Sequence, residues 1–162
     1  MLLFCRQSGL PTLLVGVWQR IIEGNLSAMD QGTATFDGRK IDLRLAPKPE
    51  VALTARKAIE LLAELLPPNK CEDVRLVVSE LVANSILHAR LLPNYRIALS
   101  VEVSGESVRG KVCDPGSGFE VPSVPCPRAD LSGGWGLPIV EKISDRWGVE
   151  RNNRVCVWFE IG

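Results

Sequence analysis

Apolar residues recur along this chain with two different periods. Between Ile41 and Leu45 they occupy every second position, which is the period of a strand with one buried face. From 50 to 66 they recur every three or four positions, which predicts an amphipathic helix that a proline pair ends. A second helix is predicted from about 70 to 90. Its inner stripe is expected to contain Cys71, Val74, Val78, Leu81, Val82 and Ser85.

Strand patterns return in the second half of the chain, with one more helix among them. A turn at Gly105 separates two of these strands, and Asn152-Asn153 is typical of a tight turn between two others. A loop rich in glycine and proline occupies about 114–133. The elements expected here are strands at 95–104 and 107–113, a helix at about 136–145, and strands at 147–151 and 154–161.

This order of elements indicates a fold class. Strands that follow one another directly pair as antiparallel hairpins, and the helices then need to cover only one face of the sheet. We therefore expect an α+β fold, a two-layer α/β sandwich with a mixed, mainly antiparallel sheet and its helices on one face.

The N-terminal part of the chain lacks this regularity. We expect residues 1–36 to be a poorly ordered extension that precedes a single domain at 37–162. Met29 is a candidate for an alternative start of translation. A short amphipathic helix that docks on the domain is the competing interpretation of this segment.

Composition narrows the classes of function. The chain has 162 residues, with 19 basic and 19 acidic side chains. Its net charge of zero argues against binding of nucleic acid through overall positive charge. The uncharged stretch Gln7 to Gln19 is shorter than the roughly 20 residues of a membrane-spanning helix. The five cysteines are odd in number and lack C-x-x-C spacing, so we expect free thiols in a reducing cytoplasm rather than disulfides or a zinc site.

Three short motifs could carry chemistry. Glu80 and Asn84 lie one helical turn apart, where a carboxylate could activate a nucleophile and an amide oxygen could bind Mg²⁺. Asp114 ends a predicted strand before two glycines and could accept a hydrogen bond from the exocyclic amine of adenine. A glycine run at 133–136 leads into a helix, whose first N–H groups attract phosphate. Each motif alone is also compatible with a solvated helix edge, a surface turn or a plain helix start.

The three motifs in this order resemble the ATPase domains of gyrase, Hsp90, histidine kinases and MutL. The run ELVANSILHA at 80–89 is similar to the N box of that family. The runs DPGSGF at 114–119 and GGWGLPIV at 133–140 are similar to its two glycine boxes. The resemblance covers about residues 38–162 and is closest to the stand-alone anti-sigma-factor serine kinases of bacteria. It implies the Bergerat ATP-binding fold.

The resemblance also implies roles for individual residues. Asn84 falls on the Mg²⁺-binding asparagine, Glu80 on the carboxylate that activates the acceptor hydroxyl, and Asp114 on the adenine-reading aspartate. The resemblance also implies further positions that bind ATP. These are Gly116 and Gly118 beside the base and ribose, Gly134, Gly136 and Leu137 at the phosphates, His88 at the end of the helix, and Arg128 in the loop at about 119–133, which would form a lid over the triphosphate.

The function that the resemblance implies is a cytoplasmic, ATP- and Mg²⁺-dependent serine/threonine protein kinase. Its expected partners are a sigma factor and a STAS-type anti-anti-sigma protein, which it would phosphorylate. Homodimers are common in this family. Two alternatives stay open: a nucleotide-dependent module that binds its partner with little kinase activity, and an orphan histidine-kinase catalytic domain. No nucleic acid or membrane is expected as a direct partner.

Overall fold

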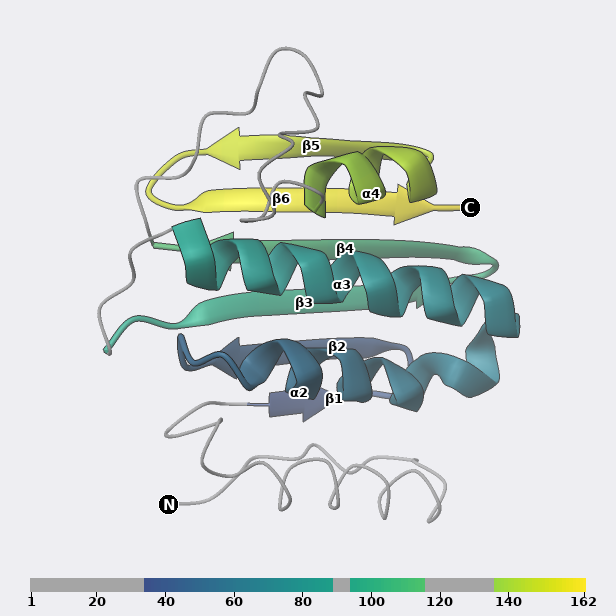
Figure 1. Cartoon of the computed structure of the whole chain (residues 1–162). Coiled ribbons are helices and arrows are strands. Elements are labelled where there is room, and N and C mark those ends of the chain that lie inside the picture. Colours follow the sequence, from purple (N-terminus) through teal and green to yellow (C-terminus); the bar gives the residue numbers. More distant parts are fainter. Residues whose placement is uncertain (1–33, 89–93, 116–135) are drawn as a thin grey trace.

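The computed structural model describes residues 34–88, 94–115 and 136–162 of the chain. In these residues helices cover one face of a six-stranded sheet whose order is β1-β2-β3-β4-β6-β5 (Figure 1). The elements are β1 (Ala34–Phe36), β2 (Lys40–Leu45), α2 (Val51–Ala58), the 3-10 helix η1 (Ile59–Leu65), α3 (Pro68–His88), β3 (Ile97–Ser104), β4 (Ser107–Asp114), α4 (Gly136–Ile143), β5 (Arg146–Arg151) and β6 (Val155–Ile161).

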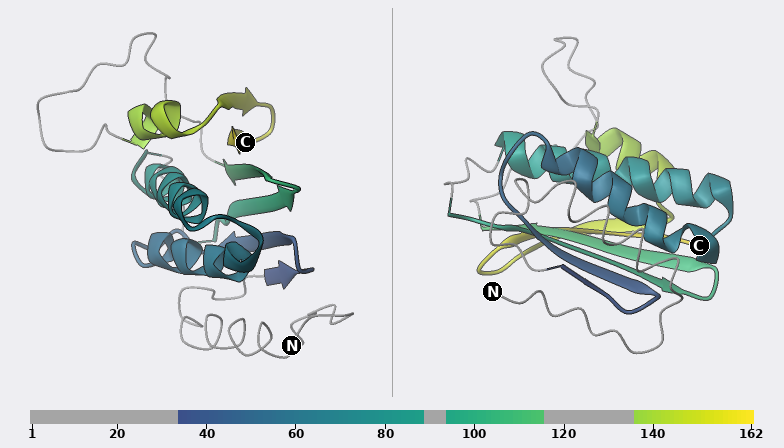
Figure 2. Two further views of the ribbon diagram at one scale, coloured as in Figure 1. Left: turned by 90° about the vertical axis from the view of Figure 1, so that its right-hand side faces the viewer. Right: turned by 90° about the horizontal axis from the view of Figure 1, so that it is seen from below.

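The two layers confirm the expected α+β sandwich, with helices and sheet stacked face to face (Figure 2). Among the described strands every pairing is antiparallel, so the sheet is more regular than the mixed sheet that the sequence suggested. The predicted strands and helices all occur, with ends that shift by a few residues.

Alternation of side chains along each strand separates the two faces of the sheet. In β6 the odd-numbered residues are buried against the helices, and the even-numbered residues are half-buried on the opposite face. The same alternation runs through β2, β3 and β4. We call the helix-covered side the inner face and the other side the open face.

The helical layer differs from the prediction in one respect. The helix expected over 50–66 is α-helical only to Ala58 and continues as the 3-10 helix η1. Ile59, Leu62 and Leu65 face the core at a spacing of three residues, which is the period of a 3-10 helix. The inner stripe expected for α3 is confirmed, since all six of its residues are buried.

Strand β1 was not predicted, because three residues are too few to show a period. It pairs with β2 through a tight connection in which the Asp37 carboxylate accepts hydrogen bonds from the N–H groups of Arg39 and Lys40, at 3.0 and 2.8 Å. Gly38 has φ 98°, a conformation that glycine adopts without strain. The sheet therefore begins at Ala34. The expectations for residues 1–33 lie outside the described residues.

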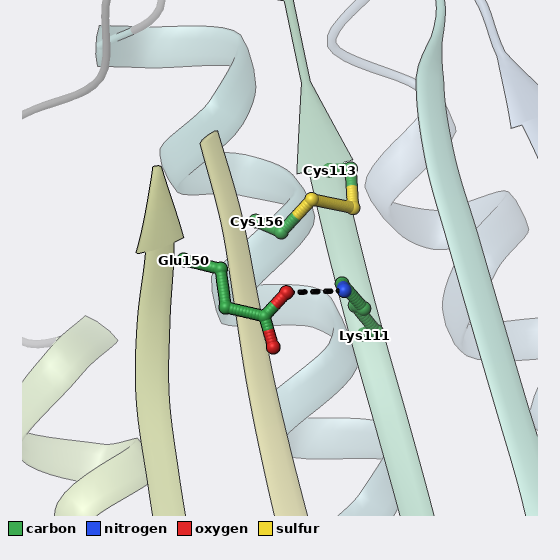
Figure 3. Close-up of a disulfide and its surroundings, with 4 residues drawn as sticks. All are labelled: Lys111, Cys113, Glu150 and Cys156. Atoms are coloured by element: carbon green, nitrogen blue, oxygen red, sulfur yellow. Dashed lines mark hydrogen bonds and ion pairs between the residues drawn. A yellow bond between two sulfur atoms is a disulfide. The ribbon is translucent and has the colours of Figure 1, made fainter. Parts of the chain in front are cut away.

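The expectation of free thiols was wrong for one pair. Cys113 in β4 and Cys156 in β6 form a disulfide, with 4.0 Å between their Cα atoms (Figure 3). The two residues are direct partners in the antiparallel register although 43 positions separate them in sequence. Residue spacing alone cannot reveal such a pair. Cys71 is free and buried, whereas Cys5 and Cys126 lie outside the described residues.

No helix in the described parts of the chain is long and apolar enough to cross a membrane.

The contact between Gly110 and Phe159 supplies a test of the register between β4 and β6. The two residues are direct partners, and a Cβ atom at Gly110 would lie within 3.0 Å of the buried Phe159 ring. We expect Gly110→Ala to lower the free energy of unfolding by about 1–3 kcal/mol through overpacking. Denaturant unfolding measures the change.

Gly148→Ala is the matched control. Its new Cβ would approach the ring of Trp158, which is half-buried on the open face and is therefore freer to move. Its loss of stability should be the smaller of the two. Equal losses for both substitutions would contradict the close contact described for Phe159.

Candidate functional site

Helix α3 presents Glu80 and Asn84 one turn apart at the border of its buried stripe. Both side chains are half-buried, while Leu81 and Ser85 beside them are buried. Within the described part of the chain neither side chain makes a hydrogen bond or ion pair. A carboxylate and an amide at such a border are therefore available to a ligand.

Asp114 is the last residue of β4 and faces the inner side of the sheet. Its exposed fraction is only 4%, and it is the register partner of Val155 in β6. The strand alternation determines this position, because a slip of one residue would turn Asp114 to the open face. A carboxylate buried here is an acceptor with a fixed direction, which suits recognition of a donor on a flat base.

The elements that bear the candidate residues pack against one another. Helix α3 packs against both β4 and α4. In Figure 1 the C-terminal end of α3 and the end of β4 both lie at the left side of the view. The structure therefore brings the helix that bears Glu80 and Asn84 together with the strand that ends in Asp114.

Helix α4 begins at Gly136, as the glycine run predicted. Leu137 is half-buried and packs against the core, and Val140 is completely buried. This packing fixes the helix from its first turn. Pro138 lies in that turn, where its missing N–H breaks no helical hydrogen bond. The N–H groups at such a helix start can bind an anion.

Five predicted site residues fall outside the described part of the chain, wholly or with their side chains. Gly116, Gly118, Arg128 and Gly134 lie outside the described residues, as does the loop between β4 and α4. His88 is the last residue of α3, and its side chain also lies outside the description. The proposals for these five residues stay predictions.

The oxygen donors of Glu80 and Asn84 are of the kind that Mg²⁺ prefers. Among the described residues there is no group of three or more His, Cys, Asp or Glu side chains that could hold a metal ion. Mg²⁺ is usually held by one or two protein oxygens together with phosphate oxygens and water. Glu80 and Asn84 offer such oxygens.

One neighbouring feature was missed by the sequence reasoning. The disulfide of Cys113 and Cys156 lies beside Asp114 in the strand and beside its partner Val155. The only sequence signal is that each cysteine precedes or follows a buried residue in a strand pattern. That signal becomes informative only once the register of β4 against β6 is known.

Comparisons with known proteins support the fold. The family described as histidine kinase-like ATPase domain matches residues 43–161. The structure resembles the crystal structure of the RsbU and RsbW domains of Rv1364c from Mycobacterium tuberculosis, with a TM-score of 0.58 and 20% identity. That match covers 75% of this chain and 32% of the other, so this chain spans about a third of the length of the chain in that structure.

A second structure is more distant. The histidine kinase domain of the blue-light activated histidine kinase from Erythrobacter litoralis EL346 is matched with a TM-score of 0.44 and 20% identity, over 91% of this chain and 72% of the other. No curated protein matches the chain in sequence.

Proposed function

The chain belongs to the histidine kinase-like ATPase family, and from this we propose that it is an ATP-dependent serine/threonine protein kinase with a regulatory role. The observation that carries the proposal is the placement of Asp114. It is buried at the end of β4, the strand against which the helix that bears Glu80 and Asn84 packs. In the proposed site, Asp114 would read the base while Glu80 and Asn84 on α3 would act at the triphosphate.

Asp114 would select adenine. Its carboxylate oxygens only accept hydrogen bonds when ionised. The amine of adenine donates a hydrogen bond, whereas guanine has an oxygen at that position and would repel the carboxylate. Burial excludes competing water, so the preference for adenine is expected to be strong.

Asn84 would hold Mg²⁺ through its amide oxygen. The half-buried position on α3 limits the rotamers of the side chain, and the shortage of other protein ligands in the described residues suits an ion that phosphates and water also coordinate. When bound, Mg²⁺ neutralises charge on the phosphates. The chain contributes the oxygen and its position.

Glu80 would orient the hydroxyl of the acceptor serine or threonine. It lies one turn before Asn84 on the same side of α3, so both side chains face one ligand. Phosphoryl transfer depends mainly on positioning and on neutralised charge, and a carboxylate that accepts the hydroxyl proton completes such a site.

The partners follow from the resemblance to anti-sigma-factor kinases. We propose that the protein binds a sigma factor and phosphorylates a STAS-type anti-anti-sigma protein in the cytoplasm, and that it forms a homodimer. The fold shared with a protein that contains RsbU and RsbW domains supports a regulatory kinase. An orphan histidine-kinase domain is distinguished by the product, because phosphoserine survives acid and phosphohistidine does not.

The nucleotide site is tested by calorimetric titration with ATP and GTP. We expect saturable binding of ATP in preference to GTP, and we expect Asp114→Asn to weaken ATP binding about 10- to 100-fold, because one charged hydrogen bond is lost. Asp73→Asn, on α3, is the matched control and should bind as the wild type does. Equal affinity for ATP and GTP would rule out base reading by Asp114.

The catalytic role of Glu80 is tested by Glu80→Gln. This variant should bind ATP normally and phosphorylate the STAS-type partner about 100-fold or more slowly, because the proton acceptor is removed. Transfer is measured with labelled ATP. Glu64→Gln, an exposed carboxylate on η1, is the control. A normal rate for Glu80→Gln would favour a module that binds its partner without this catalytic group.

The role of Asn84 is tested by the Mg²⁺ dependence of ATP binding. Asn84→Ala should bind ATP with the same affinity in the presence and absence of Mg²⁺, whereas the wild type should bind more tightly with Mg²⁺. Asn69→Ala, near the start of the same helix, keeps the wild-type response. Persistent tightening by Mg²⁺ in Asn84→Ala would refute the assignment.

A further inference from the structure

The disulfide joins two strands that are distant in sequence at the edge of the proposed site. Cys113 and Cys156 are direct partners (Figure 3). The next pair along the strands is Asp114 with Val155. Asp114 is the last residue of β4, so the covalent bond lies one residue from the strand end. The bond therefore limits how far this end of β4 can separate from β6.

The disulfide and Asp114 lie on opposite faces of the sheet. Cys113 and Cys156 are half-buried on the open face, whereas Asp114 is buried on the inner face. A reagent that reaches the sulfur atoms from the open face thus does not enter the nucleotide site. Any effect on that site must pass through the backbone of β4.

The open face offers a path to Cys113. A hollow of about 360 Å³ on this face is lined by Cys113 together with charged side chains, among them Asp42, Arg44 and Lys111. Lys111 also forms an ion pair with Glu150 at 2.6 Å, and Glu150 is the register partner of Cys156 (Figure 3). The size and mixed charge of the hollow suit a small peptide thiol that carries carboxylates and an ammonium group.

Cys71 does not offer the same chemistry. It is buried with 5% of its surface exposed, and burial raises the pKa of its thiol, so little thiolate is present near neutral pH. In the described part of the chain the disulfide pair is therefore the accessible site for thiol chemistry.

We propose that Cys113 and Cys156 form a reversible redox site that low-molecular-weight peptide thiols open from the open face, and that its state sets nucleotide affinity through the position of Asp114. The second half of this proposal rests on the proposed function. The oxidised form holds the end of β4 against β6 and is the form with higher affinity for ATP.

The exchange is balanced in two steps. A thiolate of the small thiol attacks Sγ of Cys113, forms a mixed disulfide and releases the Cys156 sulfur as a thiolate, which takes up a proton. A second thiolate attacks the small-molecule sulfur of the mixed disulfide and releases Cys113. Two small thiols are thus oxidised to one disulfide, and the protein gains two electrons and two protons. The disulfide of the same small thiol reverses the sequence.

The test uses the full chain with Cys5→Ser, Cys71→Ala and Cys126→Ser, so that only the proposed pair can react. Glutathione is the probe. Reduction should make two cysteines available to N-ethylmaleimide, counted by mass spectrometry. Hydrogen exchange at the amides of Asp114 and Val155 should become at least several-fold faster, and the dissociation constant for ATP should rise several-fold.

A control variant separates the bond from other effects of the reductant. Cys113→Ala with Cys156→Ala in the same background should show the exchange rates and ATP affinity of the reduced form, with or without glutathione. If the bond opens and the exchange rates of Asp114 and Val155 stay unchanged, the proposed coupling is overturned. If ATP binds in neither redox state, the proposed function fails, while the exchange measurement still decides whether the bond holds the strand end.

Recognition of a charged thiol in the hollow is tested by the rate at which different thiols reduce the disulfide. Arg44→Gln should slow reduction by anionic glutathione several-fold and leave reduction by neutral 2-mercaptoethanol unchanged, because only the charged thiol is attracted to the guanidinium group. Added salt should reduce the difference. Equal rates with glutathione for the variant and the parent would overturn recognition of a charged thiol in the hollow.

Discussion

The pairing of β4 with β6 is the constraint on which the rest of the structure depends. These strands are neighbours in the sheet although α4 and β5 lie between them in sequence. Their register directs Asp114 to the inner face and Cys113 to the open face, and it packs Gly110 against the ring of Phe159. One register therefore positions the proposed base-reading carboxylate, the disulfide and a tight contact in the core.

Much of this could be predicted from the sequence because local periods are strong. The two-residue period of β2 and the inner stripe of α3 each reflect burial on one side of a single element. The register between β4 and β6 could not be predicted in this way, because it depends on contacts between distant segments. For the same reason the disulfide was missed, although both cysteines lie in strands that the sequence indicated.

The candidate site also combines features that a local pattern predicts with features that depend on contacts between distant segments. Glu80 and Asn84 share one helix, so their spacing was enough to predict that they face the same side. The order of the elements predicted helices on one face of the sheet, but that α3 in particular packs against β4 depends on contacts between distant segments, which no local pattern contains. The motifs themselves contain no measure of the distance between the helix and the strand.

The position of the site at the end of a strand has a physical consequence. The backbone of a residue in the middle of β4 is flanked by ladder hydrogen bonds in both directions along the strand, whereas Asp114 is the last paired residue and has them in one direction only. Ends of strands open more readily than their centres. Selective recognition needs a fixed acceptor, and the covalent bond at Cys113 supplies rigidity at the residue next to it. A bond that thiols can break makes that rigidity adjustable, which a bond buried in the core could not do.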